Sequence, residues 1–164
     1  ARYGLIFGLI SAAYLYFGHL QRILGVTGVF MDLLGFAVWA AKIVGCIKLM
    51  QYVMKKFVLA NSEAISSDIF KLGMLIAMFS ALVYSVIAVA DQVYIFPEFY
   101  QSLYAAVIEE YAKIVPASQL EELRMLLVDL PKYTFFSTFI YCFLYGTVLS
   151  AILSRNIPPR NQYQ

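Results

Sequence analysis

The sequence predicts an all-α fold: a four-transmembrane-helix bundle with an extracytoplasmic amphipathic helical hairpin between helices 3 and 4. Of the 164 residues, 62% are hydrophobic and only 13% are charged, which is about half the charge of an ordinary soluble domain. A soluble fold of this length would have too few polar residues to cover its surface. The apolar residues are gathered in four long runs, and each is long enough to cross a bilayer as a helix.

Each predicted span is long enough to cross the hydrocarbon core of a bilayer. The first apolar run covers about 28 Å as a helix, because each residue adds about 1.5 Å. All four belong to one transmembrane domain, residues 1–155, and a cytoplasmic tail, residues 156–164, follows. The spans are residues 3–21, 26–54, 70–95 and 132–154, and the hairpin is residues 97–131.

The second span differs from the others because it contains the intramembrane polar candidates Asp32 and Lys42. An ionisable group inside lipid is by default a hypothesis of function. The two residues are ten positions apart, about 15 Å along one helix axis, so they cannot pair directly. Asp32 is best explained by proximity to the membrane interface. For Lys42, an interhelical contact, snorkelling and an ion pathway all stay open.

Local signals predict where several helices begin. Pro97, Pro116 and Pro131 divide the hairpin into two short helices, because proline is tolerated in the first turn but not in a helix interior. Ser118 and Glu121 have the spacing of a capping box for the second short helix. Residues 59–69 are predicted to be a polar connector, with Ser67 or Asp68 as the N-cap of the third span.

The distribution of basic residues predicts the orientation. With both termini cytoplasmic, the inner side carries seven Lys and Arg residues and the outer side carries four, as the positive-inside rule requires. The sequence therefore predicts a multi-pass membrane protein with both termini cytoplasmic and the hairpin on the opposite side of the membrane. The inner cations are Arg2, Lys48, Lys55, Lys56, Lys71, Arg155 and Arg160, and the outer ones are Arg22, Lys113, Arg124 and Lys132.

Small residues recur at four-residue spacing in three of the spans, which allows helix backbones to approach closely. Two interpretations are open: packing within a bundle of this one chain, or a docking seam for another subunit or a second copy. The residues of this helix-packing or partner seam are Gly4, Gly8, Ala12, Gly73, Ala77, Ala81, Ser85, Gly146 and Ser150.

Residues that could perform catalysis do not form a recognisable pattern. His19 is the only histidine, and Cys46 and Cys142 lie apart inside apolar runs, without the spacing of metal ligands. Neighbouring carboxylates such as Glu109 and Glu110 point about 100° apart on a helix, so they form a solvated face rather than a catalytic pair. The sequence therefore predicts no catalytic residue, cofactor or metal site. Its net charge of +2 does not favour nucleic-acid binding.

A layout along the chain resembles a known family. It consists of GLIFGLISAAYLYF, then Gly45-Cys46-Ile47-Lys48 leading into a basic stretch, then SSDIFKLGMLIAMFSALVYSVIAVADQVYIFPEFY. In order and spacing this is similar to the DUF4199 family of the Bacteroidota, four-span membrane proteins of unknown function. The resemblance implies a bacterial inner-membrane protein, in a family often encoded near a polyprenyl-phosphate glycosyltransferase.

Two functions from different classes are expected on these grounds. The first is a non-enzymatic accessory or scaffolding subunit of a membrane complex, linked to an envelope glycan or lipid-linked sugar system and bound to a protein partner or to itself. The alternative is a small transporter, flippase or channel element that uses Asp32 and Lys42. In both, membrane lipids surround the spans. An enzyme that acts on lipid is a third interpretation, and it requires His19, Asp32 and Asp91 to converge.

Overall fold

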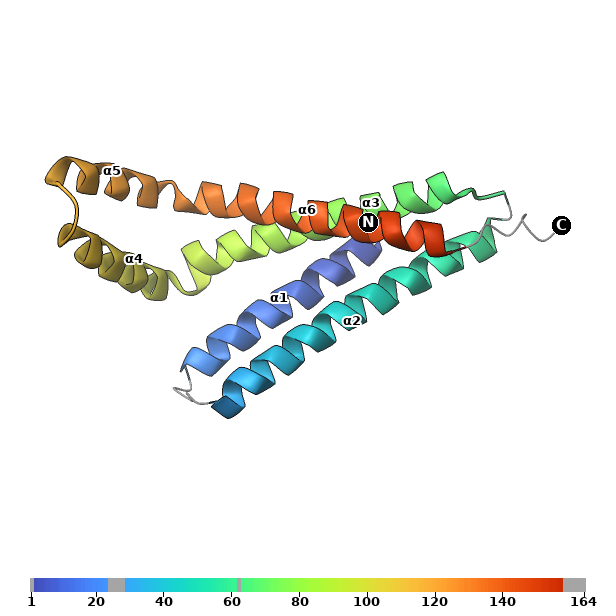
Figure 1. Ribbon diagram of the computed structural model, residues 1–164, viewed down its shortest axis with the longest axis horizontal. Helices are drawn as coiled ribbons and strands as arrows, with labels where there is room; N and C mark the ends of the chain where they lie inside the picture. The colour runs from blue at the N-terminus through green and yellow to red at the C-terminus, as the bar shows by residue number, and fades with distance from the viewer. Residues whose placement is uncertain (1, 24–28, 62, 158–164) are drawn as a thin grey trace. The chain divides into compact units, whose positions relative to one another are not determined.

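The chain is all-α in the part that the structure describes, which confirms the predicted class. The structure is a computed structural model, and it describes residues 2–23, 29–61 and 63–157. Over these ranges it contains helices and no strand (Figure 1). They are α1 (Arg2–Ile23), α2 (Val29–Ala60), α3 (Ser66–Ala90), the π-helix η1 (Asp91–Ile95), α4 (Pro97–Ala112), α5 (Ala117–Val128) and α6 (Leu130–Asn156).

Three of the described helical stretches are long and apolar enough to cross a membrane: Leu33–Ala60, Ser66–Ile95 and Leu130–Asn156. They mark the chain as a membrane protein. Helix α1 has 22 residues but a lower hydropathy, because it contains polar and small residues at intervals along its length. These residues include Arg2, Tyr3, Gly4, Gly8, Ser11, Tyr14, Tyr16, Gly18 and His19.

The connector between α2 and α3 is shorter than the sequence suggested. The prediction that it covers residues 59–69 is wrong, because α2 continues to Ala60 and α3 already begins at Ser66. Val58 is buried at the end of α2, which favours continuation of the helix. Asn61 then ends it, since both its backbone N–H and its side-chain Nδ2 donate to the Phe57 carbonyl at 3.0 Å.

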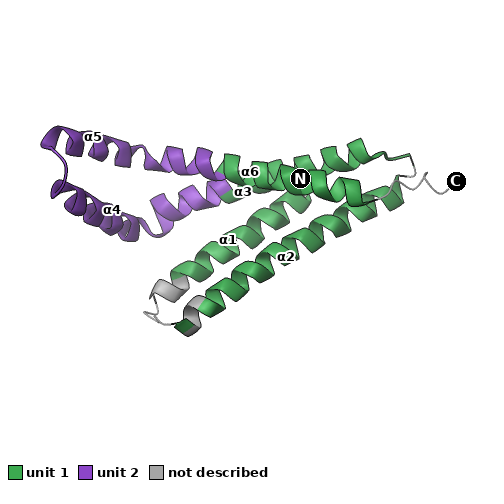
Figure 2. Cartoon of the chain, in the orientation of Figure 1, with its two compact units in different colours: residues 1–84, 139–164 green, residues 85–138 purple. Residues whose placement is uncertain are grey.

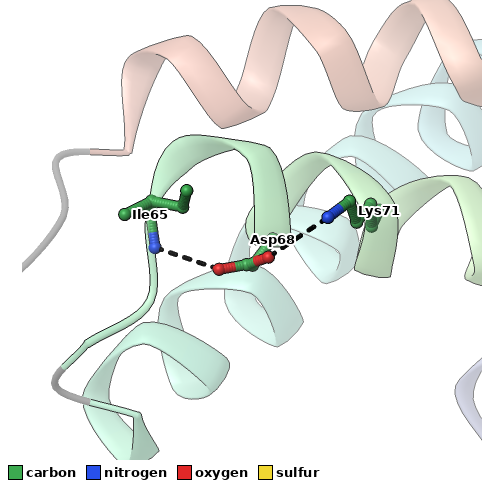
Figure 3. Close-up of polar contacts among 3 residues, drawn as sticks. All are labelled: Ile65, Asp68 and Lys71. Atoms are coloured by element: carbon green, nitrogen blue, oxygen red, sulfur yellow. Dashed lines mark hydrogen bonds and ion pairs between the residues drawn. The ribbon is translucent and has the colours of Figure 1, made fainter.

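The first turn of α3 is capped from inside the helix (Figure 3). Asp68 Oδ2 accepts a hydrogen bond from the Ile65 backbone N–H at 3.4 Å, and its Oδ1 lies 3.6 Å from Lys71 Nζ. This is the carboxylate half of a capping box, in which the third residue of the helix reaches back to the residue before it. The predicted N-cap role of Ser67 or Asp68 is therefore wrong, since both residues lie within α3.

The chain divides into two compact units (Figure 2). Unit 1 comprises residues 1–84 and 139–164, and unit 2 comprises residues 85–138. The apolar core of unit 1 draws on α1, α2, α3 and α6, and it lies toward the end where α2 finishes and α3 starts. Its buried residues are Phe7, Met50, Val53, Met54, Val58, Ile69, Ile76, Leu153 and Ile157.

Glycines allow helices of unit 1 to approach one another closely. A Cβ on Gly4 would lie 2.5 Å from Phe79 Cβ, and one on Gly8 would lie 2.6 Å from Val83 Cγ1. Similarly, a Cβ on Gly146 would lie 2.5 Å from Ala77 Cβ. These distances are too short for any side chain, so α1 and α6 each approach α3 in a way that only glycine permits.

In unit 2, α4 and α5 are short and contain no buried residue. Pro97 occupies the first turn of α4 as predicted, where its missing N–H costs nothing. The predicted capping box is wrong: α5 begins at Ala117 after Pro116 and has no side-chain cap. Ser118 therefore lies inside the first turn, and Glu121 instead lies 3.6 Å from Arg124.

Candidate functional site

A cavity of about 300 Å³ lies within unit 1. Its walls come from α1, α2, α3 and α6, and they consist mainly of aromatic and aliphatic side chains. The volume is at the lower end of the range for small-molecule sites, which are typically apolar with a few convergent polar groups. The lining residues are Phe7, Ser11, Tyr14, Trp39, Lys42, Ile43, Cys46, Met50, Ile76, Ala77, Ser80, Tyr84, Tyr141, Cys142, Tyr145, Gly146 and Leu149.

Among the described residues of this lining, Lys42 is the only charged one. Its Nζ lies 4.7 Å from the centroid of the Tyr14 ring and 5.8 Å from that of the Tyr84 ring. Both distances allow a cation–π interaction, so α1 and α3 each supply an aromatic ring to a cation on α2. The ion pairs within the described ranges all join other residues.

The position of Lys42 along its helix places it deep in the apolar stretch. It stands about 20 Å from the start of α2 and about 27 Å from the end, at about 1.5 Å per residue. A lysine side chain near a helix end can snorkel to the membrane interface, but this one lies in the middle. Its ammonium group instead faces the cavity inside the bundle.

The cavity opens on one side of the bundle. Three aromatic residues line it and are also exposed, with relative exposures of 44% for Trp39, 72% for Tyr141 and 47% for Tyr145. They come from α2 and α6. These exposed aromatic side chains mark the open side of the cavity.

The remaining polar groups of the described lining are hydroxyls, thiols and the indole N–H of Trp39. Ser11 on α1 and Ser80 on α3 contribute hydroxyl groups, while Cys46 on α2 and Cys142 on α6 contribute free, half-buried thiols. None of the described lining residues is Asp, Glu or His. The wall therefore offers hydrogen bonds and one positive charge, which suits binding better than acid–base chemistry.

The other predicted site residues fall outside the cavity or contribute only to its packing. The side chain of Asp32 lies outside the described residues. The small-residue positions mostly face other helices of the same chain: Gly73 contacts Met54 and Ser150, for example, and Ala81 and Ser85 are fully buried. Of the remaining positions, Ala12 is 3% exposed and Ala77 is 5% exposed. The seam is thus occupied by contacts within the chain.

A second polar cluster, which the sequence did not reveal, lies in unit 2. Tyr100 on α4 donates a hydrogen bond from its hydroxyl to Asp91 Oδ2 at 2.9 Å, and Gln92 Nε2 donates to the hydroxyl of Tyr104. Asp91 and Gln92 are buried in η1, where the Phe96 N–H bonds to the Asp91 carbonyl in the i→i+5 pattern. The cluster fixes α4 against η1.

The described residues contain no set of three His, Cys, Asp or Glu side chains able to hold a metal ion. Comparison with protein-family models, with curated proteins and with solved structures finds no match to this chain. The interpretation of the cavity therefore depends on its own residues.

Proposed function

We propose that this chain is a non-enzymatic, four-span membrane protein that binds an amphiphile in the cavity of unit 1. The observation that supports the proposal is the cavity itself, which lies at mid-helix between α1, α2, α3 and α6 and opens between Trp39, Tyr141 and Tyr145. An amphiphile that enters from the side can leave its hydrocarbon tail in the bilayer. Such binding also serves a small carrier or flippase, with Lys42 as the polar contact.

The topology is part of this proposal. Helix α1 serves as a fourth span because Gly4 and Gly8 hold it against α3, one of the three strongly apolar helices. The excess of Lys and Arg on one side of the spans supports cytoplasmic termini in a bacterial inner membrane. The acidic segment of α4 and α5 then lies in the periplasm.

Thiol labelling tests the binding of an amphiphile. Cys46 and Cys142 are the only cysteines of the chain, and both line the cavity, so a small methanethiosulfonate reagent reports on the cavity alone. We expect a saturating single-chain amphiphile to slow the labelling of both cysteines about tenfold, because a ligand that fills the site excludes the reagent.

The control for this experiment is a Val44→Cys variant without the two native cysteines, in which serine replaces each of them. Val44 is 55% exposed on α2 and does not line the cavity. Its labelling rate should not change when the amphiphile is added. If Cys46 and Cys142 keep their rates with every amphiphile tried, the proposed function is wrong.

A second candidate function, an accessory subunit of a membrane complex, is favoured by the surface of α4 and α5. This surface exposes large apolar side chains beside exposed glutamates such as Glu109 and Glu122, so its complement is a protein with an apolar patch and a basic rim. The resemblance to the DUF4199 family supports the same candidate. The exposed apolar residues are Leu103, Tyr111, Ile114, Met125, Leu126 and Val128.

Photo-crosslinking in native membranes tests this second candidate. A photoreactive amino acid at Met125, which is 65% exposed, should give a discrete protein adduct if a partner covers the surface. The same group at Val44, on a helix that faces lipid, should give lipid adducts only. If both positions behave alike, α4 and α5 do not form a partner surface.

A further inference from the structure

We propose that the ligand of the cavity is a monoanionic amphiphile whose carboxylate or phosphodiester oxygen atoms bind Lys42. This inference rests on the proposed function, since it names the chemical class of the ligand that the cavity binds. Three features carry it: the residue types of the wall, the hydrogen-bond donors that line the cavity, and the side opening.

The charge of the wall favours an anion. Lys42 brings one positive charge to a lining whose described residues include no acidic one, and a charge at mid-membrane is costly unless an opposite charge accompanies it. The other ion pairs in the described ranges lie on exposed helix surfaces and join residues three positions apart. A ligand with a single negative charge brings the net charge of the site to zero, whereas a cationic ligand would double its positive charge.

Among the residues that the structure describes, no side chain forms a hydrogen bond or ion pair with Lys42 Nζ, so its N–H donors are available to a ligand. An ammonium group has three N–H donors, and the rings of Tyr14 and Tyr84, at 4.7 and 5.8 Å from Nζ, contribute electrostatic attraction from their faces. An oxyanion accepts several charge-assisted hydrogen bonds, which are about twice as strong as neutral ones. The hydroxyl groups of Ser11 and Ser80, which also line the cavity, are further hydrogen-bond donors.

The side opening indicates the form of the part of the ligand that lies outside the cavity. A cavity of about 300 Å³ is at the lower end of the range for small-molecule sites. It therefore has room for a head group and only the beginning of a hydrocarbon chain. The remaining hydrocarbon passes between Trp39 and Tyr141 toward lipid. Fatty carboxylates and single-chain phosphodiester lipids both have this form, with one anionic group and one tail.

A chain-matched series of ligands separates charge from hydrophobicity. The purified protein is titrated at pH 8 with dodecanoate, dodecanol, dodecylamine and a single-chain phosphatidylglycerol, and binding is measured by protection of Cys46 and Cys142. We expect dodecanoate or the phosphodiester to bind about tenfold more tightly than dodecanol, and dodecylamine to bind most weakly. The tighter of the two anions identifies the source of the ligand.

Two variants of Lys42 test whether its charge causes the preference for an anionic ligand over dodecanol. In Lys42→Met, the preference for the anion over dodecanol should fall to about one, while the affinity for dodecanol changes less than about threefold. Lys42→Arg keeps the charge and should keep the preference. Lys42→Met should fold, because it removes a charge from an apolar helix; an unchanged elution volume and unfolding temperature verify this.

The outcomes distinguish the two proposals. If dodecanoate, the phosphodiester and dodecanol bind with equal affinity, or if the preference for an anion survives in Lys42→Met, the inference about charge is wrong and the proposed function stands. If none of the amphiphiles protects the cysteines, both are wrong. A dodecylamine affinity above that of dodecanoate would also overturn the inference.

Discussion

Replacement of Gly8 by leucine is expected to separate α1 from α3 and to lower the stability of the protein strongly. A Cβ at position 8 would lie 2.6 Å from Val83 Cγ1, 2.7 Å from Val83 Cβ and 3.2 Å from the Ser80 carbonyl oxygen. Val83 is β-branched, so its side chain cannot rotate away freely. Overpacking of this kind costs about 1–3 kcal/mol, and leucine adds three more carbon atoms beyond the first contact.

The matched control is Gly45→Leu, a glycine in the middle of α2. A Cβ there would meet nothing within 4 Å, and leucine has a higher helix propensity than glycine by about 0.5–1 kcal/mol. Thermal unfolding in a mild detergent, followed by circular dichroism, should therefore show a clear decrease for Gly8→Leu and no decrease for Gly45→Leu. Equal unfolding temperatures for the two variants would contradict the packing of α1 on α3.

Most of the helices could be predicted from the sequence because their signals are local. Apolar runs about as long as a bilayer is thick predict the helices α2, α3 and α6, and Pro97 predicts the start of α4. The errors occurred at ends where two local signals competed. Ser118 has the spacing of a capping box, yet Pro116 already directs the chain into α5 two residues earlier.

The cavity could be predicted only in part, because its residues are distant in the chain. The sequence singled out Lys42 as a charge deep in a span. Its contacts with Tyr14 and Tyr84 come from two other helices, and no spacing in one sequence determines which faces of separate helices meet. The same holds for Cys46 and Cys142, which looked like isolated apolar residues and line the same cavity from two helices.

The cluster in unit 2 escaped prediction for a different reason. Tyr100 and Tyr104 are four residues apart on α4, but their partners Asp91 and Gln92 belong to a π-helix. A π-helix depends on one backbone register shift, which leaves no compositional signal. The signal in the sequence was the presence of two polar residues, Asp91 and Gln92, at the end of the apolar helix α3.

The second large effect is expected from filling the cavity. Cys46→Phe adds a ring to a half-buried residue of the cavity wall, and the ring should occupy the space that the amphiphile requires. We expect at least a tenfold loss of affinity, about 1.4 kcal/mol or more, with little loss of stability because the cavity accepts the ring. Val44→Phe, two residues earlier and 55% exposed outside the cavity, should bind the amphiphile as the unaltered protein does.

Native mass spectrometry of the protein, extracted from its own membrane in mild detergent, tests the binding of an amphiphile most directly. We predict that the unaltered chain and Val44→Phe each carry a bound molecule of defined mass, whereas Cys46→Phe carries none. An unaltered chain that is always bare, or a Cys46→Phe chain that retains the same molecule, would contradict binding in this cavity.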